Sequence, residues 1–586
     1  MLTVRPKETV SMVTRDGVRL DADVYRPDTT DDLPVLLMRQ PYGRAIASTV
    51  VYAHPIWYAA HGYIVVIQDV RGRGSSEGEF SLFAHEIEDG EDTVNWAANL
   101  PGSTGQVGMY GFSYQGMTQL YAAANKPIAL KTICPSMIGY DLYADWAYEG
   151  GAFCYQLNLG WAIQLAAETA RRQGNVEAYQ RLYAASRNVA IHDPVCAQSE
   201  LLKELAPDSF YHDWVTHPKP DDYWDQLSPC RYMQAVDMPM LHIGGWFDTY
   251  MRGTLHFYQE MADRSAFPQH LWVGPWAHLP WGRKVGAIDY GTEASNPIDR
   301  LQIRWFDQFL KGIDTGLLAE PPIHLFEMGS HQWRSFDRYP TNHAKSYYLV
   351  TTGLAAMGDR EGFLVERTEP QSPLNPSQSF VDVFVHDPWR PMPSVGGHAT
   401  MPAGSFERGA IDCRTDGVTY TSAPLSDPLH LVGSVKVEID CMADAISFDL
   451  CAVVSEVKPN GSVFNISQGY LRVEADESGS IVFMGDRNDP TPHASPAAQW
   501  VHITLQPTCI QIPAGSAIRL TLSGACFPAY AVNPGDGSYP HQAQLINAKV
   551  ITIGIVCEGS NPTTEGDRTA SHRPSRLLLP VIPPVK

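Results

Sequence analysis

Within the first 135 residues, short apolar runs rich in β-branched residues alternate with stretches of helical character. The runs at 34–38, 63–67 and 107–111 are apolar or small throughout, as expected of parallel strands that are buried on both faces. Residues 86–100 and 116–124 read as helices, the first ending at a leucine-proline-glycine stop signal. This alternation predicts right-handed crossover units and an open, mostly parallel sheet with helices on both faces.

The character of the chain then changes. Residues 139–237 are rich in aromatic residues, alanine, glutamine and leucine, partly at helical spacing, and strand-like runs return after them. We therefore predict one α/β core, made of residues 1–138 and 238–345, with a helical cap inserted at 139–237. From 346 to 586, short alternating segments are separated by Gly, Pro, Asn and Asp, which predicts an antiparallel β-sandwich.

The composition argues against several kinds of partner. The chain has 64 acidic residues against 43 Lys and Arg, a formal net charge of −21, and no basic stripe for nucleic acid or anionic lipid. The N-terminus lacks the apolar segment of a secretory signal, and no uncharged run approaches the length of about 18 residues that spans a membrane. The ten cysteines form no C-x-x-C pair, which is typical of a reducing cytoplasm. We expect a cytoplasmic protein without metal, cofactor, nucleic-acid or membrane partners; a homo-oligomer is left open.

The segment GFSYQG at residues 111–116 lies between a predicted strand and a predicted helix. A sharp strand-to-helix turn presents a serine outward, and it needs small residues where the two elements crowd each other. The start of the helix directs N–H groups at a developing oxyanion, and the Tyr114 N–H is suitably located to donate. Ser113 is therefore the candidate nucleophile. The second glycine, Gly116, falls one residue later than in G-x-S-x-G, and a glycine-serine loop without catalytic function is the alternative.

A serine nucleophile needs a base, and the base needs an orienting carboxylate. In the α/β-hydrolase fold the order along the chain is Ser, Asp or Glu, His, each after a strand. Asp248 follows one predicted strand and His278 the next, and both strands carry glycine at their exits. His278 would accept the serine proton, while Asp248 would fix the tautomer of the imidazole and stabilise its charged form.

Motifs along both halves of the chain support a resemblance to a known family. They are RQPY at 39–42, QDVRGRGSSEG at 68–78, GFSYQG at 111–116, GWFD at 245–248, GPWAH at 274–278, GYLR at 469–472 and FPAYAVNPG at 527–535. With them the chain resembles the cocaine-esterase-like (CocE/NonD) branch of the Xaa-Pro dipeptidyl-peptidase (S15) family of serine hydrolases. In that family the second glycine of the nucleophile motif is displaced as it is here.

The resemblance implies an α/β-hydrolase domain with a helical cap and a C-terminal jelly-roll (galactose-binding-like) domain. It also implies that the hydroxyl of Tyr42 is an oxyanion donor, together with the Tyr114 N–H, and that no cofactor is used. Aromatic side chains from the cap and the triad loops are expected to hold the acyl group, although each could equally belong to the core. The candidates are Trp146, Trp161, Phe247 and Tyr250.

Relatives that act on α-amino acyl groups carry extra acids near the catalytic aspartate, whereas Thr-Tyr-Met follows Asp248 here. In the cap, Asp141 and Asp145 stay possible partners for an ammonium group. We therefore expect a small-molecule ester of a bulky or aromatic neutral acid as the substrate, cleaved through a covalent acyl-enzyme. The alternatives are amide hydrolysis, as by a β-lactam acylase or an Xaa-Pro dipeptidyl-peptidase, and a non-catalytic binding protein with the same fold.

Overall fold

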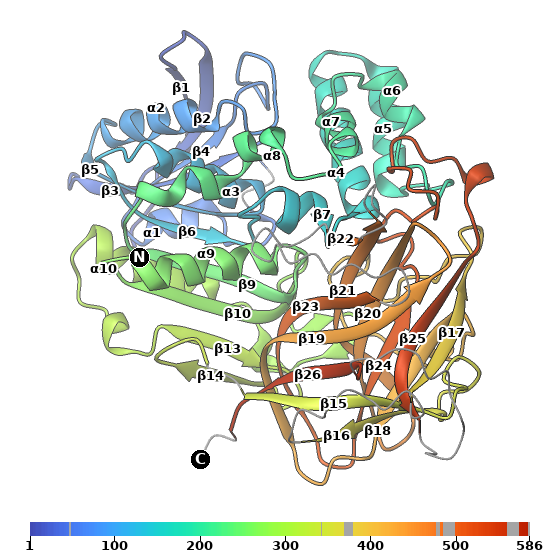
Figure 1. Cartoon of the computed structure of the whole chain (residues 1–586). Helices are drawn as coiled ribbons and strands as arrows, with labels where there is room; N and C mark the ends of the chain where they lie inside the picture. Colours follow the sequence, from blue (N-terminus) through green and yellow to red (C-terminus); the bar gives the residue numbers. More distant parts are fainter. Residues whose placement is uncertain are drawn as a thin grey trace.

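The computed structural model describes residues 1–45, 49–340, 343–367, 379–475, 481–483, 499–559 and 574–583. Figure 1 shows an α/β part on the left, a group of helices (α4 to α7) at the upper right, and a β-rich part below that group.

A mixed sheet runs through the α/β part in the order β1-β2-β4-β3-β5-β6-β9-β10-β13-β14. Neighbours from β4 to β13 are parallel, and antiparallel strands lie at both edges. The strands are β1 Glu8–Val13, β2 Arg19–Tyr25, β3 Leu33–Gln40, β4 Ile64–Asp69, β5 Ser103–Phe112, β6 Leu130–Ser136, β9 Met240–Phe247, β10 Gln269–Ala277, β13 Ile323–Glu327 and β14 Gln332–Phe336. The predicted mostly parallel sheet is confirmed.

Helices cover both faces of this sheet. They are α1 Pro55–Ala60, α2 Glu86–Ala98, α3 Tyr114–Ala124, α9 Met251–Arg264 and α10 Ile298–Leu310. Along β3, Val35 and Leu37 share a core cluster with α2 and α3, whereas Leu36 and Met38 share one with α1 and α10. Successive side chains of a strand point to opposite faces, so a strand covered on both sides must be apolar throughout.

The segment predicted as the cap, residues 139–237, lies between β6 and β9 and is called the cap below. Its elements are the π-helix η2 Tyr143–Ala147, the short hairpin β7 Tyr148–Glu149 and β8 Ala152–Phe153, the helices α4 Tyr155–Arg172, α5 Val176–Arg187, α6 Glu200–Leu205, α7 Phe210–Thr216 and α8 Asp222–Leu227, and the 3-10 turns η3 Pro229–Arg231 and η4 Met233–Ala235. The last elements pack on α3, where the Tyr121 hydroxyl donates to the Leu227 carbonyl. The helices α4 to α7 form a group beside the α/β part (Figure 1), and α4 contacts the loop after β4 through Arg172.

The C-terminal part is a strand-rich body of mostly antiparallel pairs, with β15–β25 and β16–β18 as parallel exceptions. Its main elements are β15 His343–Thr351, β16 Gly362–Glu366, β17 Ser379–His386, α11 Gly409–Asp412, β18 Gly417–Ser422, β19 Leu429–Ala443, β20 Ser447–Val457, β21 Val463–Ala475, β22 Ile481–Phe483, β23 Gln499–Ile512, β24 Ala517–Ser523, β25 Ile551–Gly559 and β26 Arg576–Val581. In β19, buried Val435 and Val437 alternate with exposed Lys436, the period-2 pattern of a half-buried strand. The jelly-roll topology stays a prediction.

The β-rich part joins the α/β part through side chains and backbone. Met328, just after β13, forms a parallel bridge with Ile510 of β23, and α9 packs against the same strand. One core cluster holds Trp246 and Met251 together with residues of the C-terminal strands. Among the described helices, none combines the length and apolar character needed to cross a membrane.

Candidate active site

Ser113 occupies a strained turn between β5 and α3. Its backbone has φ of +59° and ψ of −129°, a region that costs a residue with a Cβ of the order of 1–3 kcal/mol. The turn is held by hydrogen bonds: the Ser113 N–H donates to the Ser136 carbonyl (3.0 Å), and the Ser113 carbonyl accepts the Met117 N–H (2.9 Å). Strain of this kind persists where the surrounding structure imposes it, and it presents the side chain at the end of the strand.

Two glycines make this turn possible. A Cβ on Gly111 would lie 2.5 Å from Gln115 Cβ, and Gly111 itself has φ of +147°. A Cβ on Gly116 would lie 2.4 Å from Ile138 Cγ2 and 2.8 Å from the Ser136 carbonyl oxygen. A side chain at position 116 therefore has no space against Ser136 and Ile138, which gives a physical reason for a glycine one position later than in the usual motif.

Asp248 and His278 follow β9 and β10, which are parallel neighbours in the sheet. The His278 Nδ1 and Asp248 Oδ1 atoms are 2.8 Å apart; the Asp248 side chain is fully buried and that of His278 is 29% exposed. The ring of Phe112, the residue before Ser113, lies 5.4 Å from the His278 ring. The three residues predicted as a triad thus converge at one edge of the sheet.

Tyr42 follows β3, the strand beside β5. Its hydroxyl accepts the Trp161 indole N–H at 3.0 Å and forms a hydrogen bond with Ser113. Burial raises the pKa of the Tyr42 phenol to about 12, although the hydrogen bonds with Trp161 and Ser113 oppose this shift. At neutral pH the phenol is therefore protonated and able to donate.

Only the backbone of Tyr114 is available for the predicted oxyanion site, because its side chain is held elsewhere. Its hydroxyl donates to Glu86 Oε1 (2.8 Å), and its ring stacks on Phe83 with 4.6 Å between centroids. The side chain is fully buried in this packing between α2 and α3, whereas the N–H lies in the first turn of α3, directly after Ser113.

Three of the four candidate pocket aromatics form one cluster. The Trp146 ring lies 4.2 Å from that of Tyr250 and 5.1 Å from that of Trp161, and the Tyr250 ring lies 4.9 Å from His278. The cluster therefore connects the hydroxyl of Tyr42 to the imidazole of His278. Phe247 lies elsewhere: it packs with Tyr290 (6.4 Å) in the core shared with the C-terminal strands.

Residues of the C-terminal part hold the loop that carries Asp248, and no sequence pattern predicted them. The Gln506 side-chain amide donates to the Asp248 carbonyl (2.6 Å), and the Thr249 hydroxyl donates to the His398 carbonyl (2.6 Å). No motif or spacing singles out Gln506, because it lies 258 residues from its partner in sequence.

The described residues contain no group of three or more His, Cys, Asp or Glu side chains arranged to hold a metal ion.

Two models of one protein family match the chain. Residues 16–280 match the X-Pro dipeptidyl-peptidase (S15 family) model, and residues 315–577 match the X-Pro dipeptidyl-peptidase C-terminal non-catalytic domain. The chain is also 29% identical over 591 residues to the cocaine esterase of Rhodococcus sp. (strain MB1 Bresler), a match that covers 98% of both proteins.

Solved structures share the fold over the full chain. An aminopeptidase from the marine sediment archaeon Thaumarchaeota archaeon has a TM-score of 0.76 at 21% identity and covers 99% of this chain and 96% of its own. An α-amino acid ester hydrolase has a TM-score of 0.74 at 22% identity, covering 99% and 97%. A CocE/NonD family hydrolase from Staphylococcus aureus has a TM-score of 0.66 at 18% identity, covering 99% and 93%. At these identities the likeness concerns the fold, and the predicted α/β-hydrolase class is confirmed.

Proposed function

Because the chain belongs to the X-Pro dipeptidyl-peptidase (S15) family of serine hydrolases, in its cocaine-esterase-like (CocE/NonD) branch, we propose that it hydrolyses carboxylic esters of bulky or aromatic neutral acids. The observation that carries this proposal is the 2.8 Å contact between His278 Nδ1 and Asp248 Oδ1, beside the strained turn at Ser113. A histidine oriented by a buried carboxylate next to an outward-presented serine is the arrangement that activates a hydroxyl nucleophile.

In the proposed mechanism, Ser113 Oγ attacks the acyl carbonyl carbon while His278 Nε2 accepts the serine proton. Asp248 holds Nδ1 of the imidazole and stabilises the positive charge that forms. The Tyr42 hydroxyl and the Tyr114 N–H donate to the carbonyl oxygen as it becomes an oxyanion. His278 then protonates the leaving alcohol. A water molecule, deprotonated by the same imidazole, hydrolyses the acyl-enzyme and releases the acid.

The surroundings of the proposed site favour a neutral acyl group. The aromatic cluster of Trp146, Trp161 and Tyr250 offers apolar surface beside the triad. The cap acid Asp145 is occupied, because its carboxylate accepts the backbone N–H groups of Tyr140 (3.2 Å) and Asp141 (2.8 Å). An acid committed to the backbone in this way is a poor partner for a substrate ammonium group.

Covalent labelling tests the proposed nucleophile. We expect a fluorophosphonate probe to modify the wild-type protein but not Ser113→Ala. The control is Ser81→Ala, which removes a serine that is exposed at the surface, and it should be labelled like the wild type. A wild-type protein that stays unlabelled would contradict the hydrolase proposal and favour the binding-protein alternative.

A panel of aryl esters that differ only in the acyl group measures the preference for the acyl group. We expect a larger kcat/KM for phenyl-substituted acyl groups than for acetyl esters.

Amide hydrolysis is the rival activity, and the family name of the matching models is the observation that favours it. Matched ester and anilide substrates of one acyl group separate the two, and an Xaa-Pro anilide tests dipeptidyl-peptidase activity directly. If kcat/KM for the Xaa-Pro anilide exceeds that for every ester in the panel, the ester proposal is wrong.

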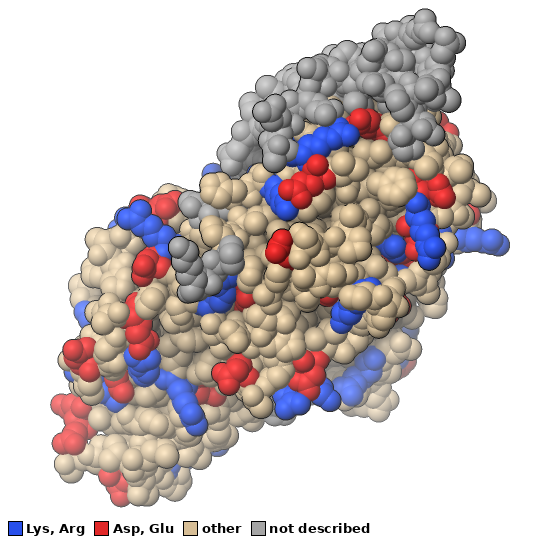
Figure 2. All heavy atoms as spheres, turned by 90° about the horizontal axis from the view of Figure 1, so that it is seen from below, with Lys and Arg blue, Asp and Glu red and all other residues tan. Residues whose placement is uncertain are grey.

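We further propose a cytoplasmic enzyme built from an α/β core (1–138 and 238–345), a cap (139–237) and a jelly-roll domain (346–586), with no cofactor and no nucleic-acid or membrane partner. The net charge of −21 supports the proposal that nucleic acid and anionic membranes are not partners. On the face seen in Figure 2, acidic and basic side chains are interspersed on a mostly uncharged surface, without a large basic patch. Light scattering would establish whether the enzyme is a homo-oligomer.

A further inference from the structure

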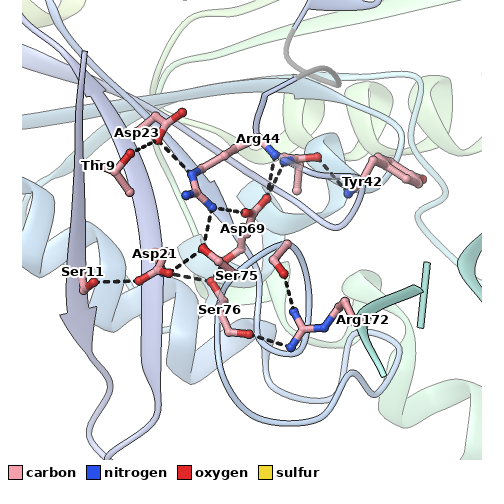
Figure 3. A network of polar contacts seen from close by, with 12 residues as sticks. Thr9, Ser11, Asp21, Asp23, Tyr42, Arg44, Asp69, Ser75, Ser76 and Arg172 are labelled. Carbon is pink, nitrogen blue, oxygen red and sulfur yellow. Dashed lines mark hydrogen bonds and ion pairs between the residues drawn. The ribbon is translucent and has the colours of Figure 1, made fainter. Parts of the chain in front are cut away.

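Both ends of the turn that carries Tyr42 are hydrogen-bonded to one carboxylate, that of Asp69 at the end of β4 (Figure 3). Asp69 Oδ1 accepts the Gln40 side-chain amide (2.9 Å) before the turn and the Arg44 backbone N–H (2.7 Å) after it. Inside the turn, the Tyr42 N–H donates to Gln40 Oε1 (2.9 Å). The chain from 40 to 44 is thereby fixed at both ends and at its centre.

Arg44 neutralises this buried carboxylate. Its guanidinium pairs with Asp69 Oδ2, donates from Nε to Asp23 Oδ1 (2.9 Å), and donates from Nη1 to the Ser75 hydroxyl (3.0 Å). The Asp69 side chain is 1% exposed, so burial raises its pKa, and the charge and hydrogen bonds of Arg44 oppose that shift. A buried charge that is paired and fully hydrogen-bonded holds its neighbours rigidly.

The loop after β4 is shaped around the same carboxylate. A Cβ on Gly74 would lie 1.8 Å from Asp69 Oδ2, and Gly74 has φ of +51°. Arg172 of α4 donates to the carbonyls of Gly74 and Ser76, each at 2.9 Å. The same helix supplies Trp161, whose indole N–H reaches the Tyr42 hydroxyl. The QDVRGRGSSEG motif, the Tyr42 turn and the cap helix therefore form one connected unit.

We propose that Asp69 is a positioning residue for the oxyanion donor Tyr42: by closing the turn from Gln40 to Arg44, its carboxylate holds the phenol against Ser113 before substrate binds. This inference rests on the proposed esterase function. A preorganised donor stabilises the transition state without reorganising during the reaction, and a donor displaced by about 1 Å can lose about 100-fold in rate. In this role Asp69 acts through Tyr42 and not on the reacting atoms.

A double-mutant cycle tests this role. Asp69→Asn, which removes the charge that pairs with Arg44 and turns an amide NH2 toward its guanidinium, is combined with Tyr42→Phe. The rates of aryl ester hydrolysis and of fluorophosphonate labelling are measured for all four proteins. We expect Asp69→Asn to lower both rates about 10–100-fold when Tyr42 is present, with KM nearly unchanged, and less than about 2-fold in the Tyr42→Phe background. Labelling is a single covalent step at the serine, with no turnover, so it reports even on slow variants.

Asp382→Asn in β17 is the matched control. Asp382 is equally buried (1% exposed) and accepts the Thr351 hydroxyl (2.8 Å) and the Tyr420 hydroxyl (2.9 Å), remote from the site in sequence. We expect this change to lower stability without lowering the labelling rate. If circular dichroism shows that Asp69→Asn is unfolded, Gln40→Met replaces it in the cycle, since it removes the bonds to both Asp69 and Tyr42.

An equal loss in the two backgrounds would overturn the proposal, because it would mean that Asp69 acts on the fold and not through Tyr42. The proposed function fails in a different way, when the wild-type protein is neither labelled nor active.

Discussion

At the scale of the residue, the proposed role of Tyr42 depends on whether its phenol is protonated. Tyr42 can support an oxyanion only while its phenol is neutral, and burial raises the pKa of that phenol to about 12 despite the hydrogen bonds with Trp161 and Ser113. An ordinary tyrosine titrates near pH 10. The raised pKa means that the deprotonated form is disfavoured, so the donor persists to higher pH than in an exposed tyrosine.

We expect Tyr42→Phe to lower kcat/KM about 100–1000-fold, the typical loss for one oxyanion donor, with a small effect on KM. Because the phenol stays protonated, the ratio of wild-type to Tyr42→Phe activity should be constant from about pH 7 to 10. Steady-state kinetics of both proteins across that range provide the measurement, and titration of His278 cancels in the ratio. A ratio that falls by half near pH 10 would show an unshifted phenol.

At the scale of the element, the contact between α3 and the end of β6 sets the position of Ser113. The Ser136 carbonyl accepts the Ser113 N–H, and the same oxygen would lie 2.8 Å from a Cβ on Gly116. The helix can thus approach the strand, and hold the turn, only where it has no side chain.

We expect Gly116→Ala to lower the free energy of unfolding by about 1–3 kcal/mol and to reduce kcat, since the added methyl group must push α3 away from Ile138 and Ser136. Thermal unfolding and ester hydrolysis measure the two effects. Gly160→Ala is the matched control in α4, where the nearest atom to an added Cβ is Val189 Cγ2 at 3.3 Å. That change should be neutral or stabilise by about 0.5–1 kcal/mol, as expected for alanine in a helix.

At the scale of the whole molecule, a buried cluster of polar groups joins the three parts of the chain. Glu149 of the cap accepts hydrogen bonds from His398 (2.8 Å) and from the Tyr530 hydroxyl (2.5 Å) of the C-terminal part, and it pairs with Arg252 of α9 (2.8 Å). Burial alone would raise the pKa of Glu149, but Arg252 and His398 lower it to about 2. The backbone carbonyl of His398 also accepts the hydroxyl of Thr249, the residue directly after Asp248.

We expect Glu149→Gln to lower the free energy of unfolding by up to about 3–5 kcal/mol at pH 7, because it leaves Arg252, whose side chain is only 19% exposed, without its ion-pair partner. A folded-state pKa below the unfolded value contributes stability that is complete above about pH 4.5 and is lost as the pH falls toward 2. The difference between wild type and Glu149→Gln should therefore shrink below about pH 4.5.

Denaturant midpoints between pH 7 and pH 3 measure this dependence. Glu204→Gln, which breaks the exposed pair with Arg181, is the control and should not change the midpoint measurably. A difference between wild type and Glu149→Gln that is the same at every pH would contradict the cluster as the source of this stability.

The sequence by itself was enough for the features that depend on neighbours along the chain. Continuous apolar runs required strands covered on both faces, and the alternation of those runs with helices required a mostly parallel sheet. The strand-turn-helix context of Ser113, and the strands before Asp248 and His278, identified candidate residues that converge at one sheet edge.

Only the tertiary structure decided which side chains meet across long separations. The packing of the cap on the sheet makes Trp161 the partner of Tyr42. The packing of the C-terminal strands makes Gln506 the support of Asp248 and places Phe247 in the core. The periodicity of apolar residues indicates which side chains are buried, but not which residues they pack against. That choice is made by the close packing of surfaces that lie hundreds of residues apart in the chain.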